Sequence, residues 1–174
     1  MHQKLPKDIH PWRMAQSGIQ LSGELAINTM PRLCRSLHDD TGLVTARLNF
    51  DVDEIGTPYL AGQLEGEINL LCQRCLLPMR YHISSTFTLA MVMSESKMAT
   101  LADQYEPWHL TSDEPVLLTE IIEDELILSL PLIPKHDQQC IPSQFLESKD
   151  ILAPVTDTQS ASPFAVLSHL KGNH

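Results

Sequence analysis

Alternating apolar and polar residues in four segments constrain the fold of this chain more than any other feature of its sequence. The clearest segment places Val44, Ala46, Leu48, Phe50 and Val52 on one side, with polar residues between them. A period of two is typical of β-strands with one buried and one solvated face, and such strands most often form antiparallel sheets. We therefore predict an α+β fold with a mostly antiparallel, partly barrel-like β-sheet, whose other strands lie in 19–27, 63–72 and 81–91.

Two helices are predicted beside this sheet. Asn28 can cap a short N-terminal helix that runs to about His38, with Pro31 tolerated in its first turn. One long acidic amphipathic helix is expected to start at Asp113-Glu114-Pro115, where a capping residue, an acid and a proline all favour a helix start. Pro131 should end it.

The long helix carries adjacent carboxylates that fall on different sides. Glu123 and Asp124 lie on its polar half, whereas Glu125 falls inside the apolar stripe. Leaving a buried carboxylate unpaired costs on the order of several kcal/mol, so we expect Glu125 to pair with Arg74 or Arg47. These three acidic residues are also candidates for contacting a partner.

Composition divides the chain into three parts. Its 174 residues are enough for one sizeable core, and we predict a single globular domain over 1–146. Residues 147–162 are rich in Ser, Thr, Asp and Pro and predict a flexible linker. Residues 163–174 predict a short helical segment that either docks on the domain or binds a partner, with Phe164 and Leu167 as contacts. The oligomeric state stays open.

The sequence predicts a cytoplasmic protein without a membrane partner. No segment approaches the roughly 18 to 20 apolar residues that a membrane helix needs. Residues 1–12 contain charges and prolines but no apolar signal core. Four cysteines in such a chain are expected to be reduced.

Negative charge is concentrated in the second half of the chain. The net charge is −10, yet residues 1–94 carry eight Lys and Arg against nine Asp and Glu. Residues 95–174 carry four against thirteen. This half is either a solvated acidic face or a surface for a basic protein, and the sequence leaves both open.

The sequence Cys72-Gln73-Arg74-Cys75 follows one of the predicted strands and should lie at the tip of a β-hairpin. Zinc sites use pairs of Cys or His at this spacing, and His136 with Cys140 could complete a tetrahedral site. Zinc is therefore the candidate cofactor. A redox-active thiol pair and an unliganded structural turn are the alternatives.

The sequence contains few signals for catalysis or for RNA binding. No Gly-rich phosphate loop, nucleophile elbow or H-E-x-x-H motif is present, so we expect no enzyme and no catalytic residues. Arg47, Arg74 and Arg80 are candidates for binding RNA, with Tyr81 and His82 near enough to stack on bases.

An ordered set of motifs resembles the YceD family. It contains Cys72-Gln73-Arg74-Cys75 with Leu76 and Pro78, the helix residues 122–131, Pro134 with His136-Asp137, and Pro163-Phe164-Ala165-Val166-Leu167. Pro11, Ala15-Gln16 and Tyr105-Glu106-Pro107 are also similar, so the resemblance spans nearly the whole chain. Some members of that family have further cysteines after the helix, whereas this chain has only His136 and Cys140 there.

The resemblance implies a role in accumulation of large-subunit ribosomal RNA, and hence in ribosome biogenesis, in bacteria and chloroplasts. It implies no catalytic activity. Our hypothesis is a biogenesis factor that binds ribosomal RNA, a basic ribosomal protein, or both. The alternatives are a zinc-stabilised module for protein interaction and a redox-active C-x-x-C protein.

Overall fold

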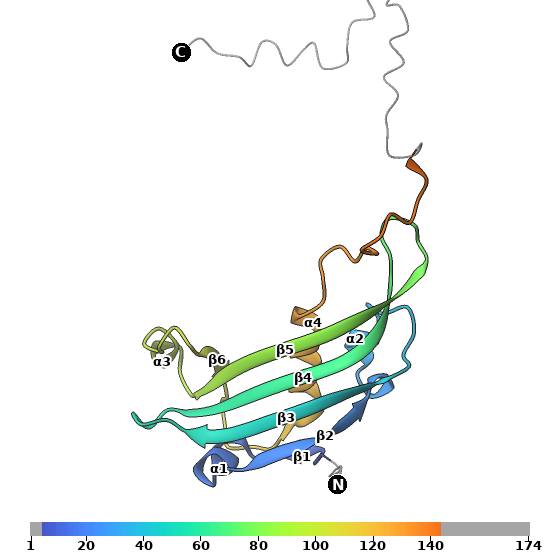
Figure 1. Cartoon of the computed structure of the whole chain (residues 1–174). Helices are drawn as coiled ribbons and strands as arrows, with labels where there is room; N and C mark the ends of the chain where they lie inside the picture. The colour runs from blue at the N-terminus through green and yellow to red at the C-terminus, as the bar shows by residue number, and fades with distance from the viewer. Residues whose placement is uncertain (1–4, 144–174) are drawn as a thin grey trace, which may run out of the picture. The chain divides into compact units, whose positions relative to one another are not determined.

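The structure, a computed structural model, describes residues 5–143. Its main feature is a five-stranded sheet in which each strand lies beside its neighbour in sequence (Figure 1). The first four strands are antiparallel and the fifth joins in parallel, which confirms a mostly antiparallel sheet in an α+β fold. The strands are β2 (Gln20–Ala26), β3 (Leu43–Val52), β4 (Pro58–Leu71), β5 (Pro78–Val92) and β6 (Glu106–His109).

The predicted alternation sets which face of the sheet is buried. On β3, Val44, Ala46, Leu48 and Phe50 are at most 2% exposed, whereas the residues between them face outward. The helix α4 (Leu118–Leu128) covers this buried face, as Figure 1 shows. The core therefore lies between α4 and one side of the sheet, and the other side is polar.

The sheet is open, so the prediction of a partly barrel-like sheet is wrong. Within residues 5–143, β2 pairs only with β3 and β6 only with β5, which leaves two edges. Two further short strands pair with each other and not with these edges. They form a separate two-stranded sheet of β1 (Asp8–Ile9) and β7 (Val116–Leu117).

The acidic helix is shorter than predicted. It begins at Leu118, not near Asp113, and has 11 residues. The reason is that Val116 pairs with Ile9 of β1, which holds this part of the chain in an extended conformation. The residues that favour a helix start near Asp113 are therefore outweighed by strand pairing with a segment far away in the sequence.

The predicted helix over 28–38 is also shorter in the structure. A 3₁₀ turn (Ile27–Thr29) and the helix α2 (Pro31–Cys34) replace it. The backbone N–H of His38 donates to the carbonyl of Asn69 on β4, so the chain has left the helix by that point. The N-terminal helix α1 (Pro11–Gln16), with proline in its first turn, lies in a segment where we predicted none.

All the described helices and strands lie in one compact unit, Met1–Cys140. The predicted domain over 1–146 extends past residue 143, where the described part ends. The predicted linker 147–162 and the predicted terminal segment 163–174, with Phe164 and Leu167, lie outside the described residues.

Candidate functional site

The C-x-x-C sequence forms a tight turn at the tip of the β4–β5 hairpin. The N–H of Leu76 donates to the carbonyl of Cys72 at 2.8 Å, and the N–H of Cys72 donates to the carbonyl of Leu77 at 3.0 Å. Leu76 has a positive φ of 59°, a left-handed conformation that non-glycine residues rarely adopt. The turn aims backbone donors at sulfur, because the N–H of Arg74 lies 3.4 Å from Cys72 Sγ.

The segment that follows α4 packs against this turn. The carbonyl of Pro134 accepts from the N–H of Gln73 at 2.8 Å. Arg74 donates from Nη2 to the carbonyl of His136 at 2.9 Å, and also to the carbonyl of Gln138. Its Nε donates to Cys140 Sγ at 3.0 Å. Arg74 therefore holds the loop that carries His136 and Cys140 against the hairpin tip.

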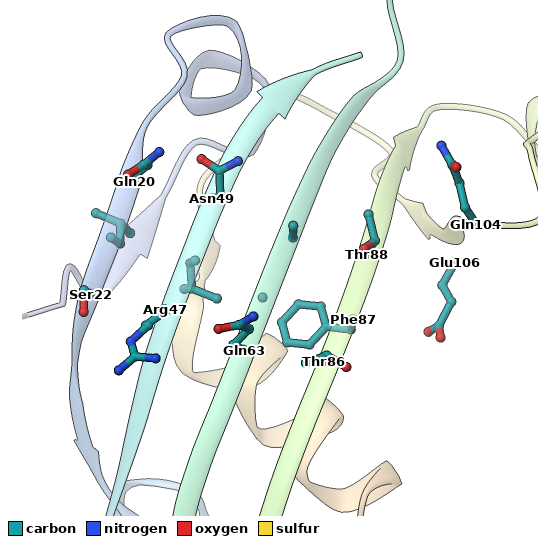
Figure 2. A pocket seen from close by; sticks show the side chains of 14 residues that line it. Gln20, Ser22, Arg47, Asn49, Gln63, Thr86, Phe87, Thr88, Gln104 and Glu106 are labelled. Carbon is teal, nitrogen blue, oxygen red and sulfur yellow. The ribbon is translucent and has the colours of Figure 1, made fainter. Parts of the chain in front are cut away.

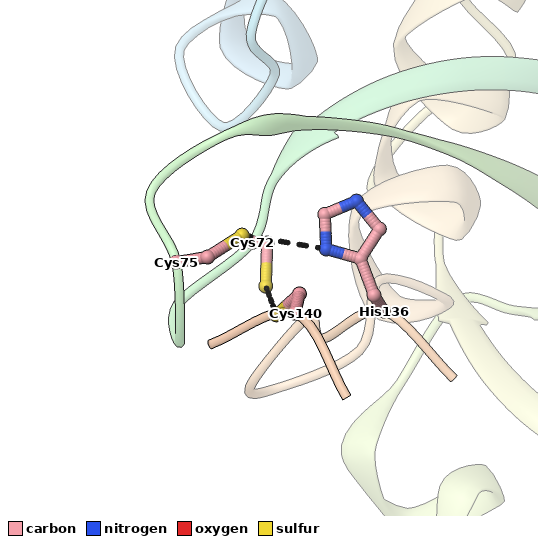
Figure 3. Close-up of side chains that lie close together, drawn as sticks. All are labelled: Cys72, Cys75, His136 and Cys140. Carbon is pink, nitrogen blue, oxygen red and sulfur yellow. Dashed lines mark hydrogen bonds between the residues drawn. The ribbon is translucent and has the colours of Figure 1, made fainter. Parts of the chain in front are cut away.

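Three sulfurs and one imidazole meet at this contact (Figure 3). All four ligand atoms, from Cys72, Cys75, His136 and Cys140, lie within 4.8 Å of one another. The Sγ atoms of Cys72 and Cys140 are 3.8 Å apart, and Cys75 Sγ is 3.5 Å from Nδ1 of His136. We refer to these four residues as the Cys3His cluster.

The spacing of these atoms fits a tetrahedral metal site. Zinc bonds of about 2.3 Å to sulfur and about 2.0 Å to nitrogen, at tetrahedral angles, separate two sulfurs by about 3.8 Å. The same geometry separates sulfur from nitrogen by about 3.5 Å. Both separations match those in the Cys3His cluster. The group could therefore hold a metal ion, with two of its ligand separations already at the tetrahedral values.

The surroundings of the cluster lower the pKa of the Cys72 and Cys140 thiols, which favours the thiolate form that binds metal, whereas burial raises the pKa of the Cys75 thiol. Burial alone raises the pKa of the Cys72 thiol. Backbone N–H groups of Cys75, His136 and Arg74 donate to its sulfur, outweigh burial and lower this pKa to about 5. At Cys140, burial is likewise outweighed by the hydrogen bond from the Arg74 side chain, so its pKa is lowered.

The structure separates the three arginines that we grouped as candidates for RNA binding. Arg74 is used within the cluster and is only partly exposed. Arg47 and Arg80 are exposed on the outer face of the sheet, opposite Gln63 and Asn69 in register. Those two partners are six positions apart on β4, so Arg47 and Arg80 lie about 20 Å apart along the sheet.

Arg47 lines a broad hollow of about 730 Å³ on the outer face of the sheet (Figure 2). Amide and hydroxyl side chains from β2, β3, β4 and β5 line it together with Phe87 and the carboxylate of Glu106 on β6, and the helix α4 lies behind the sheet in this view. The amide and hydroxyl groups can donate and accept hydrogen bonds. The labelled examples beside Arg47 are Gln20, Ser22, Asn49 and Gln63.

Glu123 is buried, although the helical wheel placed it on the polar half of α4. Its side chain is 4% exposed, and its Oε2 accepts from Nε of Arg32 at 2.8 Å. Its Oε1 accepts from the backbone N–H groups of Arg32 and Leu33 at 2.5 and 3.0 Å. Asp124, which is exposed, accepts from Nη1 of the same arginine. Glu123 therefore caps α2, and the expectation of a solvent-facing side chain was wrong.

Glu125 lies inside the apolar stripe as predicted, but its expected ion pair is absent. The residue is 8% exposed, and within residues 5–143 neither Arg74 nor Arg47 reaches it. Burial, helped by the negative charges of Glu106 and Asp124, raises the pKa of Glu125 to about 7. The pairing prediction failed because Arg74 binds the Cys3His cluster and Arg47 lies on the opposite face of the sheet.

This unpaired carboxyl should make stability depend on pH. Its folded-state pKa of about 7 lies above the ordinary 4.5, so stability is lost as pH rises from about 4.5 through 7. We expect Glu125→Gln to remove this loss and to raise the free energy of unfolding near pH 8 by about 2 kcal/mol. Urea unfolding at a series of pH values measures it.

The matched control is Glu65→Gln, which removes one exposed carboxylate from the outer face of the sheet. It should leave the pH profile unchanged. A difference between Glu125→Gln and the unmodified protein that stays constant across this pH range would contradict the prediction.

No helix among residues 5–143 is long and apolar enough to cross a membrane. The sequence profile described as "Large ribosomal RNA subunit accumulation protein YceD" matches residues 60–171. This chain belongs to the YceD family. The match includes the whole Cys3His cluster and α4.

A relative from Haemophilus influenzae extends the similarity to the N-terminal strands. It is named large ribosomal RNA subunit accumulation protein YceD and is 30% identical over 168 residues, which cover 97% of each chain. No solved structure matches the chain. The contacts that sequence reasoning missed are those of Arg32, which lies 91 positions from Glu123, and of Trp108, which lines the same hollow as Glu125. Neither has a local sequence signal for these contacts.

Proposed function

We propose that this protein is a non-enzymatic cytoplasmic factor that promotes accumulation of large-subunit ribosomal RNA by binding a basic protein of the assembling subunit. One observation carries the role: nearly the whole chain is similar to a relative named for that accumulation. The negative charge of the chain supports a basic protein as the partner, because proteins that bind ribosomal RNA are themselves basic and an acidic surface attracts them. The net charge of −10 is concentrated after residue 94.

The Cys3His cluster is proposed to bind zinc as a structural ion. Cys72 and Cys75 come from the hairpin tip, and His136 and Cys140 come from the loop after α4. Zinc in such a site supplies four bonds that fix two chain segments together. The ligands and Arg74 would then hold the loop in one conformation next to the acidic helix. A redox role is less well supported, because the pair lies in a hairpin turn and not at a helix start.

Direct contact with ribosomal RNA is the second candidate, favoured by Arg47 in its polar hollow. Amide and hydroxyl groups can bind exposed bases, and an arginine can bind a phosphate. Arg80 lies on the same face and could bind a more distant phosphate. Arg74 is not proposed for this role, because its donors are occupied within the cluster.

Depletion in bacterial cells tests the role, and crosslinking tests the partner. Loss of the protein should lower large-subunit ribosomal RNA relative to small-subunit ribosomal RNA, and expression of the unmodified chain should restore the ratio. Crosslinking of the tagged chain in cells should recover basic large-subunit proteins. An unchanged ratio on depletion would overturn the proposed role.

The double variant Arg47→Ala/Arg80→Ala separates the two modes of contact. If RNA crosslinks fall strongly in this variant while protein crosslinks persist, the outer sheet face binds RNA. If neither RNA nor large-subunit proteins crosslink to the unmodified chain, both modes are wrong.

A further inference from the structure

Two adjoining hollows lie between β6 and α4, on the opposite side of the sheet from Arg47. Each has a volume of about 350 Å³, and Trp108, Ile121 and Asp124 line both. One hollow also contains Glu125 and Glu106, and Glu106, on the edge strand β6, lines the hollow around Arg47 as well. The other extends past Glu114 and Glu120 to the loop before β7. Together they form an acidic groove with an aromatic side chain at its middle.

The charges of this groove are almost all negative. Five carboxylates line it, and among residues 5–143 no lysine or arginine does. Asp124 accepts a hydrogen bond from Arg32, which belongs to the cap of α2. Within residues 5–143, Glu106 and Glu125 form no ion pair. The groove thus has more negative charge than its own fold neutralises.

Glu125 is the informative member of the groove, because it is 8% exposed and has no hydrogen-bond or ionic partner among residues 5–143. A buried, unpaired carboxyl destabilises a fold unless something pairs with it. Burial raises its pKa to about 7, and a cation in the hollow would return it to the ionised form. The position therefore favours a positively charged ligand.

A metal ion fits this hollow poorly. Among the described residues, the side chains close enough to share an ion are those of the Cys3His cluster, and the carboxylates of the groove do not form such a group. The hollow that Glu125 lines is also lined by Trp108, Pro107 and Leu89, which offer an aromatic and apolar surface. A flat cation with an apolar stem satisfies the carboxylate and this surface at once.

Resting on the proposed function, we infer that the groove receives an arginine side chain of the basic protein partner, with the guanidinium between Glu125 and Trp108. Arginine fits better than lysine, because its planar guanidinium donates two parallel hydrogen bonds to a carboxylate and stacks on an indole face. Glu106 and Glu120 then attract neighbouring basic residues of the same segment.

A labelled peptide tests this binding directly. The probe is a short glycine–serine peptide with several arginines, titrated with the full-length protein at low salt and followed by fluorescence anisotropy. Glu125→Gln should weaken its binding about tenfold or more, because a charge-assisted hydrogen bond is lost. Glu65→Gln removes the same charge from the outer sheet face and should weaken it by about twofold or less.

A second probe separates the guanidinium from general charge. The same peptide with citrulline in place of arginine keeps the shape and loses the charge, and should not bind measurably. The inference is overturned if the citrulline peptide binds equally well, or if Glu125→Gln and Glu65→Gln weaken binding equally. It is also overturned if Glu125→Gln affects a labelled RNA oligonucleotide more than it affects the arginine peptide.

Failure of this inference and failure of the proposed function give different results. If depletion lowers large-subunit ribosomal RNA but Glu125→Gln leaves peptide binding unchanged, the groove assignment is wrong and the role stands. If the groove binds the arginine peptide as described but depletion leaves the RNA ratio unchanged, the role is wrong and the groove still binds arginine. Misfolding is excluded when thermal unfolding of Glu125→Gln matches or exceeds that of the unmodified chain.

Discussion

Protein purified without chelator should contain about one zinc ion per chain, and Cys72→Ala should abolish this zinc content. Cys72 is fully buried, and three backbone donors lower its thiol pKa to about 5, so it is a thiolate at neutral pH, the form that binds zinc. Structural zinc sites contribute about 10 to 16 kcal/mol of apparent binding free energy at neutral pH. The ion should therefore remain bound through gel filtration, and elemental analysis by mass spectrometry measures it.

Removal of the ion should also lower stability. When free zinc exceeds its dissociation constant about a thousandfold, linkage adds about 4 kcal/mol to the free energy of unfolding. Chelator should remove this increment from the unmodified chain and should have no effect on Cys72→Ala. Thermal unfolding with and without chelator makes the comparison.

Cys34→Ala is the matched control, because Cys34 lies in α2 outside the cluster, where its thiol donates to the carbonyl of Ile27. This variant should keep its zinc. Arg74→Ala retains all four ligands but loses the donor that holds Cys140, and should weaken zinc affinity about 10- to 100-fold. Metal-free protein whose Cys72 and Cys75 cycle reversibly through a disulfide would contradict the zinc site and support the redox alternative.

The strands could be predicted because the period of two is a local signal. Val44, Ala46, Leu48 and Phe50 alternate with polar residues, and all four are buried as the pattern requires. The open shape of the sheet could not be predicted in this way. No local pattern encodes where the sheet ends, or that β1 pairs with β7 through Ile9 and Val116 in a separate sheet. The same contact shortens α4.

The Cys3His cluster was also accessible from the sequence, because each pair of ligands lies within a few residues. The contacts that hold the pair Cys72 and Cys75 against the pair His136 and Cys140 could not be predicted from the sequence. Arg74 was expected to pair with Glu125 or to bind RNA, yet its donors bind Cys140 and two carbonyls of the loop after α4. Pairing of Glu125 with an arginine was inferred only from the free energy that burying an unpaired carboxylate costs. That free energy does not identify a partner. Among residues 5–143 the carboxyl of Glu125 has no partner. The acidic groove that it lines is formed by β6 and α4, so it is visible only in the structure.

Glu123→Gln should lower the free energy of unfolding at neutral pH by about 3 kcal/mol, the cost of breaking a buried ion pair. The carboxylate accepts from Nε of Arg32 and from the N–H groups of Arg32 and Leu33. No side chain of α2 itself caps its first turn, so Glu123 supplies the cap from α4. The neutral amide can accept fewer of these hydrogen bonds, and it leaves the arginine without its buried countercharge. Urea unfolding measures the loss.

The pH dependence of this effect distinguishes the ion pair from simple packing. Burial tends to raise the pKa of Glu123, but the donors from Leu33 and Arg32 outweigh it, so the pKa lies below 4.5. The stabilisation is therefore full above about pH 4.5 and is lost as pH falls through the folded-state pKa. The unmodified chain and Glu123→Gln should converge in stability in acid. Asp124→Asn, which removes the exposed half of the same arginine contact, should cost at most about 1 kcal/mol. Equal losses for the two variants, or a Glu123→Gln deficit that persists unchanged in acid, would show that the charge on Glu123 does not hold α2 against α4.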